Sequence, residues 1–280
     1  MSVANSAAKA SLIENVVADL DGETAALLGI LSPLPATGWD APTPAEGWTI
    51  RDQVTHLAFF DDATLLALAD REAFLAQRAE LLALGHRFPD MVAERYRSLP
   101  GAHCLAWFTR SRTALLAAYP DADPDVRLPW YGPDMGLASS VTGRLMETWA
   151  HGQDIADSLG LLRPPGNRLR QIAELGVRTF AFSFQLRGRA VPSRPVRVEL
   201  AGPGGEQWAW GPAAAEDTVT GSVLDFCLVV TQRRNLADTG LRVTGPVATE
   251  WMGIAQAFAG APSDGRPAGL FAALAMGGWS

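Results

Sequence analysis

RLMETWAHGQD, residues 144–154, is the stretch of sequence on which the fold assignment of this chain rests. Glu147 and His151 are four residues apart, so on an α-helix they project from the same face, one turn from each other. A carboxylate and an imidazole arranged in this way are suitable ligands for a first-row metal in the core of a helical bundle. The segment therefore predicts a helix that carries two candidate metal ligands.

Helical spacing of apolar residues extends over most of the first 160 residues. The metal-ligand helix is expected to start with Ser139 or Ser140 as its N-cap and to end at Gly160. Thr49 with Asp52 three residues later is typical of a helix start, because both side chains can bind free N–H groups. The pattern favours an up-down four-helix bundle with elaborated crossovers, whose other expected helices span residues 7–31, 49–69, 72–84, 89–98 and 105–118. The last two ranges would be one broken helix or two adjacent helices, interrupted near Pro100-Gly101.

His56 is the third candidate ligand, because it lies within the second predicted helix, in the run Val-Thr-His-Leu-Ala. Two histidines and one carboxylate leave at least one coordination position open, as expected of a catalytic metal site. Each signal has a plainer alternative. A histidine on an apolar helix is often a hydrogen-bonded core residue, and Glu147 and His151 could form an ordinary surface pair.

A change of pattern after Arg163-Pro164-Pro165-Gly166 predicts a domain boundary. Residues 1–163 would form the helical bundle and residues 164–280 a small α+β domain, so the expected fold class is α+β. Alternating residues predict strands that form an antiparallel sheet. The expected elements are helices over 169–186, 222–234 and 247–258 and strands over 196–201, 207–210, 218–220 and 241–244.

Composition and charge exclude several classes of protein. The formal net charge is −7, from 23 Lys and Arg against 30 Asp and Glu, which disfavours nucleic-acid binding. The apolar runs are too short for a membrane span, and the N-terminal residues lack the apolar core of a secretory signal. Cys104 and Cys227 predict neither a disulfide framework nor a thiolate metal site. We expect a cytoplasmic protein with a small-molecule substrate; the sequence does not decide between a monomer and a homodimer.

The N-terminal half also resembles a known family. Residues 47–57, Gly-Trp-Thr-Ile-Arg-Asp-Gln-Val-Thr-His-Leu, and residues 147–154 match the DinB-like metal-binding bundle of the mycothiol-dependent maleylpyruvate isomerases. This resemblance implies that His56, Glu147 and His151 bind a divalent metal, most simply zinc. The second half, with residues 218–221 and 243–246, is similar to a sterol-carrier-protein-like domain. Because it carries residues 130–133, Trp-Tyr-Gly-Pro, together with residues 147–154, the chain most resembles an uncharacterised actinobacterial subgroup described as metal-binding.

Further residues are candidates for catalysis or cofactor binding. Tyr131 could line the pocket and donate a proton, or could serve in packing alone. Arg144 could hold an anionic group, or form a surface salt bridge. Asp154 could orient His151 from outside the coordination sphere, or could be solvated. Arg233 and Arg234 could bind a carboxylate of a thiol cofactor, or could complement the C-terminal dipole of their helix.

The leading functional hypothesis is a divalent-metal-dependent isomerase or transferase. By the resemblance, the metal would activate a low-molecular-weight thiol, mycothiol, for isomerisation of a small electrophile or for S-transfer to it. One alternative is a metal-dependent hydrolase, lyase or cyclase that uses no thiol. The other is a non-enzymatic protein that binds a metal or a small ligand. The sequence names neither the substrate nor the physiological metal.

Overall fold

The computed structural model describes residues 3–271 of the chain. It separates into two compact units, Met1–Arg163 and Pro164–Ser280, which we call the bundle unit and the C-terminal unit. The fold class is α+β, as predicted.

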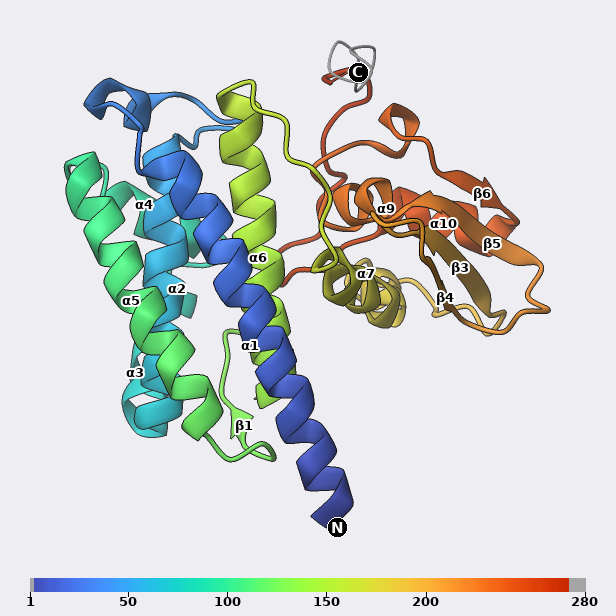
Figure 1. The fold of residues 1–280 in the computed structure, drawn as a ribbon, viewed down its shortest axis with the longest axis horizontal. Coiled ribbons are helices and arrows are strands. Elements are labelled where there is room, and N and C mark those ends of the chain that lie inside the picture. Colours follow the sequence, from blue (N-terminus) through green and yellow to red (C-terminus); the bar gives the residue numbers. More distant parts are fainter. Residues whose placement is uncertain (1–2, 272–280) are drawn as a thin grey trace. The chain divides into compact units, whose positions relative to one another are not determined.

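Four long helices form the bundle unit (Figure 1). Helix α2 packs against α5 and α6, and α1 packs against α6 and α5, so the four helices enclose one core. Two short helices lie between α2 and α5 in the chain, and a two-stranded antiparallel ribbon, β1 and β2, precedes α6. The bounds are α1 Val3–Leu31, η1 Ala36–Asp40, α2 Ile50–Ala69, α3 Arg71–Leu82, α4 Phe88–Arg95, α5 Gly101–Asp121, β1 Arg127–Leu128, β2 Met135–Gly136 and α6 Leu137–Ser158.

Local signals fix the start of α2 and the end of α6. The Thr49 hydroxyl accepts from the Asp52 N–H, and the Asp52 carboxylate accepts from the Thr49 N–H, which completes the predicted capping box. Gly160 follows the C-cap of α6 with a φ of 64°, as predicted for that glycine. The predicted start of α6 was wrong. The helix begins at Leu137, directly after β2, with Gly136 as a cap that offers no side chain, so Ser139 and Ser140 lie inside the helix.

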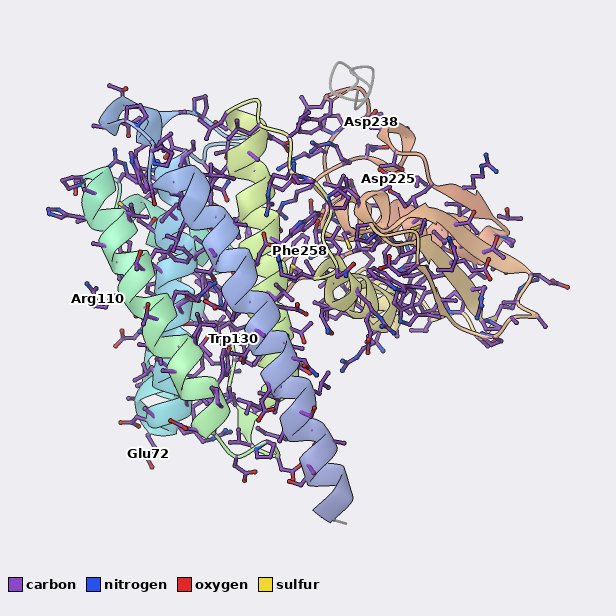
Figure 2. All side chains as sticks on the ribbon, in the orientation of Figure 1. Glu72, Arg110, Trp130, Asp225, Asp238 and Phe258 are labelled. Carbon is purple, nitrogen blue, oxygen red and sulfur yellow. The ribbon has the colours of Figure 1, made fainter. Side chains whose placement is uncertain are left out.

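The bundle core takes apolar side chains from all four long helices. Leu27 of α1, Val54 of α2, Phe108 of α5 and Ile155 of α6 are fully buried in one cluster. Figure 2 shows side chains at the outside of this unit, where Arg110 of α5 and Glu72 of the short helix α3 project away from their helices. Burying each large apolar side chain contributes about 1.5–3 kcal/mol, so this cluster supplies much of the driving force for helix packing.

A charged cluster lies inside the same bundle. Asp61 of α2 is fully buried and accepts from Arg112 Nε of α5 at 2.8 Å and from Arg144 Nε of α6 at 3.0 Å. Arg112 also donates to Thr24 Oγ1 at 2.7 Å, and Arg144 donates to the Leu57 carbonyl at 3.1 Å. One carboxylate therefore ties together three of the four long helices, with α1 joined through Thr24.

The C-terminal unit contains a four-stranded sheet in the order β4-β3-β5-β6. Strand β3 pairs antiparallel with β4 but parallel with β5, and β5 pairs antiparallel with β6. The bounds are α7 Leu169–Arg178, α8 Phe180–Gln185, β3 Val196–Ala201, β4 Gln207–Trp210, β5 Asp217–Ser222, α9 Val223–Val230, η2 Leu236–Asp238, β6 Arg242–Thr244 and α10 Pro246–Ile254. No helix within residues 3–271 is both long and apolar enough to cross a membrane.

Two predictions for this unit were wrong. The sheet is mixed, because β4 ends beside the start of β3 and a short connection then carries the chain to the other side of β3. Gly211 allows this turn with a φ of 82°, and a Cβ there would lie 2.2 Å from the Val196 carbonyl oxygen. The single helix expected over 169–186 is broken at Thr179, whose hydroxyl bonds to the carbonyls of Leu175 and Gly176.

Candidate metal centre

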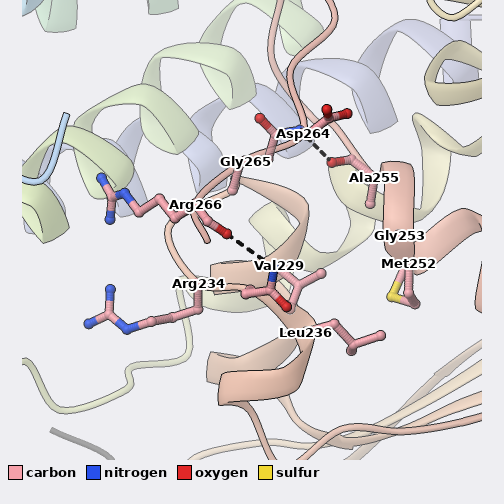
Figure 3. Close-up of a pocket in the computed structure, with 11 residues that line it drawn as sticks. Val229, Arg234, Leu236, Met252, Gly253, Ala255, Asp264, Gly265 and Arg266 are labelled. Atoms are coloured by element: carbon pink, nitrogen blue, oxygen red, sulfur yellow. Dashed lines mark hydrogen bonds between the residues drawn. The ribbon is translucent and has the colours of Figure 1, made fainter. Parts of the chain in front are cut away.

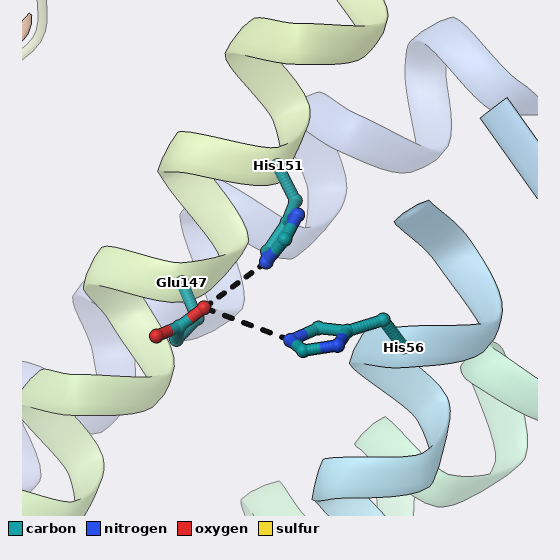
Figure 4. A group of neighbouring side chains, drawn as sticks. All are labelled: His56, Glu147 and His151. Atoms are coloured by element: carbon teal, nitrogen blue, oxygen red, sulfur yellow. Dashed lines mark hydrogen bonds and ion pairs between the residues drawn. The ribbon is translucent and has the colours of Figure 1, made fainter. Parts of the chain in front are cut away.

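The structure brings the three predicted ligands together at one place between α2 and α6 (Figure 4). Glu147 Oε2 lies 3.0 Å from His151 Nε2 and 3.8 Å from His56 Nε2. One ligand atom from each residue lies within 4.8 Å of the other two. Helix α6 supplies two ligands through its four-residue spacing, and α2 supplies the third from across the bundle.

The donor set fits a divalent cation such as zinc. Zinc bonds to nitrogen and oxygen are about 2.0–2.2 Å long, so the ligand atoms of a tetrahedral site stand roughly 3.3–3.6 Å apart. The two distances to Glu147 Oε2 bracket this range. A side-chain exposure of 24% for Glu147, against 12% for His56 and 10% for His151, makes the carboxylate the most accessible of the three groups.

The electrostatics of the site keep two of its candidate ligands, His56 and Glu147, in the forms that bind metals. Burial, followed by the neighbouring His151, lowers the pKa of His56 to about 4, so its imidazole is neutral at pH 7. Burial acts to raise the pKa of Glu147. The hydrogen bonds and charges of His151 and His56 outweigh burial and hold that pKa well below its usual value. A neutral imidazole and an ionised carboxylate are the ligating forms of these side chains.

Aromatic rings flank the two imidazoles. The Trp48 ring is stacked on the ring of His151, with 5.9 Å between centroids and 12° between planes, and it lies 5.2 Å from the ring of His56. Phe60 packs against His56 at 4.5 Å. The Trp48 indole N–H donates to Asp90 Oδ1 at 3.0 Å, which fixes the ring in place. These ring contacts cover part of each imidazole, and little of either side chain is exposed.

Comparisons with known proteins place the chain in a family and match its fold. Residues 20–156 match the family described as the mycothiol maleylpyruvate isomerase N-terminal domain. Uncharacterised proteins from two strains of Mycobacterium tuberculosis are each 44% identical over 253 residues, which cover 89% of this chain and 97% of theirs. A crystal structure of the mycothiol-dependent maleylpyruvate isomerase superposes with a TM-score of 0.55 at 15% identity, over 84% of this chain and 95% of that one. A histidine-to-alanine variant of that enzyme gives 0.54, over 79% and 89%.

The chain belongs to the DinB-like, mycothiol maleylpyruvate isomerase-like family. Residues 192–242 match a second family, described as wyosine base formation. This match covers β3, β4 and β5 and ends at the start of β6. The resemblance of the C-terminal unit to a sterol-carrier-protein-like domain stays a prediction.

Sequence reasoning missed one residue at the site of this family member. Gln53 is fully buried on α2, one turn before His56, and its Oε1 forms a short hydrogen bond with His151 Nδ1. The signal for Gln53 in the sequence is weak, since only its i, i+3 spacing from His56 places it on the same face of the helix. Asp154, the residue expected to orient His151, is fully buried on α6, so its alternative as a solvated residue was wrong.

Tyr131 and Arg144 lie near the site without reaching the three ligands. Tyr131 packs edge-on against Phe60, and its hydroxyl donates to Gln77 Oε1 at 3.2 Å. Burial raises the pKa of the Tyr131 phenol, so the hydroxyl keeps its proton at neutral pH. Arg144 is 3% exposed and donates to Asp61, so the alternative of a surface salt bridge was wrong. A catalytic role for either residue stays a prediction.

Arg233 and Arg234 belong to the C-terminal unit, directly after α9. Arg233 donates to the carbonyl of Thr231, the C-cap of α9, where a positive charge complements the helix dipole. Arg234 donates to the carbonyl of Arg233, which lies beyond the end of this helix. Arg234 lines a cavity of about 60 Å³ (Figure 3). Ligand sites generally take about 300–1,000 Å³. The cavity by itself is therefore small for a thiol cofactor, and cofactor binding by these arginines stays a prediction.

Proposed function

We propose that this protein is a divalent-metal-dependent isomerase that uses mycothiol, with His56, Glu147 and His151 as the ligands of a zinc ion. The observation that carries the proposal is the convergence of two imidazoles and a carboxylate, from two helices, in a chain that belongs to the maleylpyruvate isomerase-like family. Three protein ligands leave a position for a small molecule, which distinguishes a catalytic site from a closed structural one.

The roles of the side chains follow from their surroundings. Zinc in this site would lower the pKa of a coordinated thiol and so supply a thiolate at neutral pH. Glu147 contributes the negative charge that balances part of the charge of the cation, and His56 contributes a neutral donor. Trp48 and Phe60 confine the imidazoles and exclude water beside them, which strengthens electrostatic interactions within the site.

The test is an assay of the zinc-loaded protein with mycothiol and a cis-alkene electrophile such as maleylpyruvate. In isomerisation, the thiolate adds to the double bond, rotation follows, and elimination returns the thiol, so the cis isomer disappears while the thiol concentration stays constant. In S-transfer, one thiol disappears for each thioether formed. We expect isomerisation with constant thiol. Consumption of thiol would show that the protein is a transferase and not an isomerase.

A matched pair of histidine variants tests the assignment of the site. His151→Ala should lose metal and turnover together, whereas His103→Ala, an exposed histidine of α5, should keep both. Turnover that proceeds equally without mycothiol would overturn the thiol-dependent mechanism in favour of a hydrolase, lyase or cyclase. Metal binding without turnover of any electrophile would overturn the enzymatic proposal altogether.

A further inference from the structure

A chain of hydrogen bonds leads from the backbone to the candidate ligand His151. The Thr43 hydroxyl donates to the Trp48 carbonyl at 2.9 Å, Gln53 Nε2 donates to Thr43 Oγ1 at 2.8 Å, and Gln53 Oε1 bonds to His151 Nδ1. We propose that Gln53 is a positioning residue that fixes the proton of His151 on Nδ1 and thereby directs Nε2 toward a metal ion. The proposal rests on the metal site of the proposed function and adds a residue to it.

The direction of each hydrogen bond follows from the backbone end of this chain. The Trp48 carbonyl can only accept, so the single hydroxyl proton of Thr43 must point to it. The Thr43 oxygen is then an acceptor for Gln53, which must turn its NH₂ group toward Thr43. The carbonyl oxygen of the Gln53 amide therefore faces His151. Since that oxygen can only accept, His151 Nδ1 must carry the proton.

With the proton on Nδ1, the Nε2 atom of His151 is the ring nitrogen whose lone pair can bind a metal ion. When the imidazole is neutral, one nitrogen carries the proton and the other has the lone pair, so Nε2 then has its lone pair on the side of Glu147 Oε2, which lies 3.0 Å away. Two electron-rich atoms at this distance require either a proton or a cation between them. Residues that fix the tautomer of a ligating histidine from outside the coordination sphere are a general feature of metal sites.

The second histidine of the site lacks such a partner. His56 Nδ1 is buried and has no hydrogen-bond partner among the described residues. His56 is held instead by ring contacts with Trp48 and Phe60, which restrict the position of the ring but do not select a tautomer. The two imidazoles therefore differ, and Gln53 makes His151 the preorganised ligand.

The first experiment determines the tautomer directly. Long-range ¹H–¹⁵N correlation spectra of the metal-free protein at pH 8 report which ring nitrogens of His151 carry protons. The wild-type protein should show a protonated Nδ1, and Gln53→Leu should show loss of this single state in favour of a mixture of tautomers. An unprotonated Nδ1 in the wild-type protein would overturn the proposal, whatever reaction the protein catalyses.

The second experiment measures zinc affinity by competition with a chelator. Gln53→Leu should weaken zinc binding about 10- to 100-fold, as is typical for loss of an outer-sphere partner. Gln53→Glu keeps an acceptor for Nδ1–H and should stay within about threefold of the wild-type affinity. The matched control is Gln153→Leu, another buried glutamine of the bundle unit, whose Nε2 donates to Asp157 Oδ1.

The outcomes separate the two proposals. If Gln53→Leu and the wild-type protein bind zinc equally while His151→Ala does not bind it, the positioning role of Gln53 is wrong and the metal site stands. If His151→Ala also binds zinc like the wild type, the metal site itself is wrong. If Gln53→Leu loses helicity or thermal stability that Gln153→Leu keeps, the tautomer of His151 in the Gln53→Glu protein becomes the deciding measurement. Only the positioning role predicts that His151 Nδ1 keeps its proton in this variant.

Discussion

Replacing Asp61 with alanine should destabilise the bundle unit severely. Asp61 accepts from both Arg112 and Arg144, and all three side chains are at most 3% exposed. The variant leaves two arginines buried without this carboxylate. Removing one partner of a buried ion pair costs about 3–5 kcal/mol, mainly because the remaining charge is no longer compensated. Whole domains have stabilities of about 5–15 kcal/mol, so the loss is a large share of the total.

Urea unfolding followed by far-ultraviolet circular dichroism measures this loss. With an m-value of about 2 kcal/mol/M, the expected change lowers the unfolding midpoint by about 1.5–2.5 M. The matched control is Asp62→Ala, the next residue of α2, an exposed aspartate that accepts from the Trp107 indole N–H at 2.7 Å. Its stability should fall by about 1 kcal/mol or less. Equal shifts for the two variants would refute the argument from buried charge.

Three other perturbations test separate parts of the structure. His56→Ala should reduce the metal content, measured by elemental analysis, from about one ion per chain to background, and unchanged content would show that His56 is no ligand. Burial raises the pKa of Cys227 well above its usual value, so its thiol stays protonated at pH 8. A thiol reagent should therefore label Cys227 only in denaturant, and rapid labelling of the folded protein would contradict this expectation. Gly101→Ala places a Cβ 2.3 Å from the Trp39 ring and should cost about 1–3 kcal/mol in thermal or urea unfolding. Gly143→Ala, with no atom within 4 Å, should instead gain up to about 1 kcal/mol, and similar losses for both glycines would argue against the steric explanation.

The parts of the fold that the sequence predicted depend on local chemistry. The capping box at Thr49 involves residues three apart, so its geometry follows from the helix itself. The relation of Glu147 to His151 is likewise set by the helical repeat. The approach of His56 to this pair was also expected, but only as a hypothesis, because it depends on how α2 packs against α6.

The missed features are of two kinds. Some depend on residues that are distant in the chain, and others depend on the relative direction of neighbouring strands, which the pattern of side chains does not reveal. Alternation along Val196–Ala201 indicates which face of β3 is buried, but not whether a neighbouring strand runs parallel to it. Gln53 lies 98 residues from His151, and Asp61 lies 83 residues from Arg144. Neither pair leaves a signal in a single sequence, because the residues meet only after the helices have packed.

The buried charged cluster also constrains how this bundle can evolve. A change at Asp61, Arg112 or Arg144 alone leaves the opposite charge buried without its partner. Joint replacement of all three by well-packed apolar residues can leave the stability of the fold unchanged or even raise it. Mutational effects at the three positions are therefore strongly non-additive. In a deep mutational scan, these sites should show sign epistasis. Drift toward an uncharged interior would have to cross a fitness valley, which explains how such a cluster can persist without being the most stable solution.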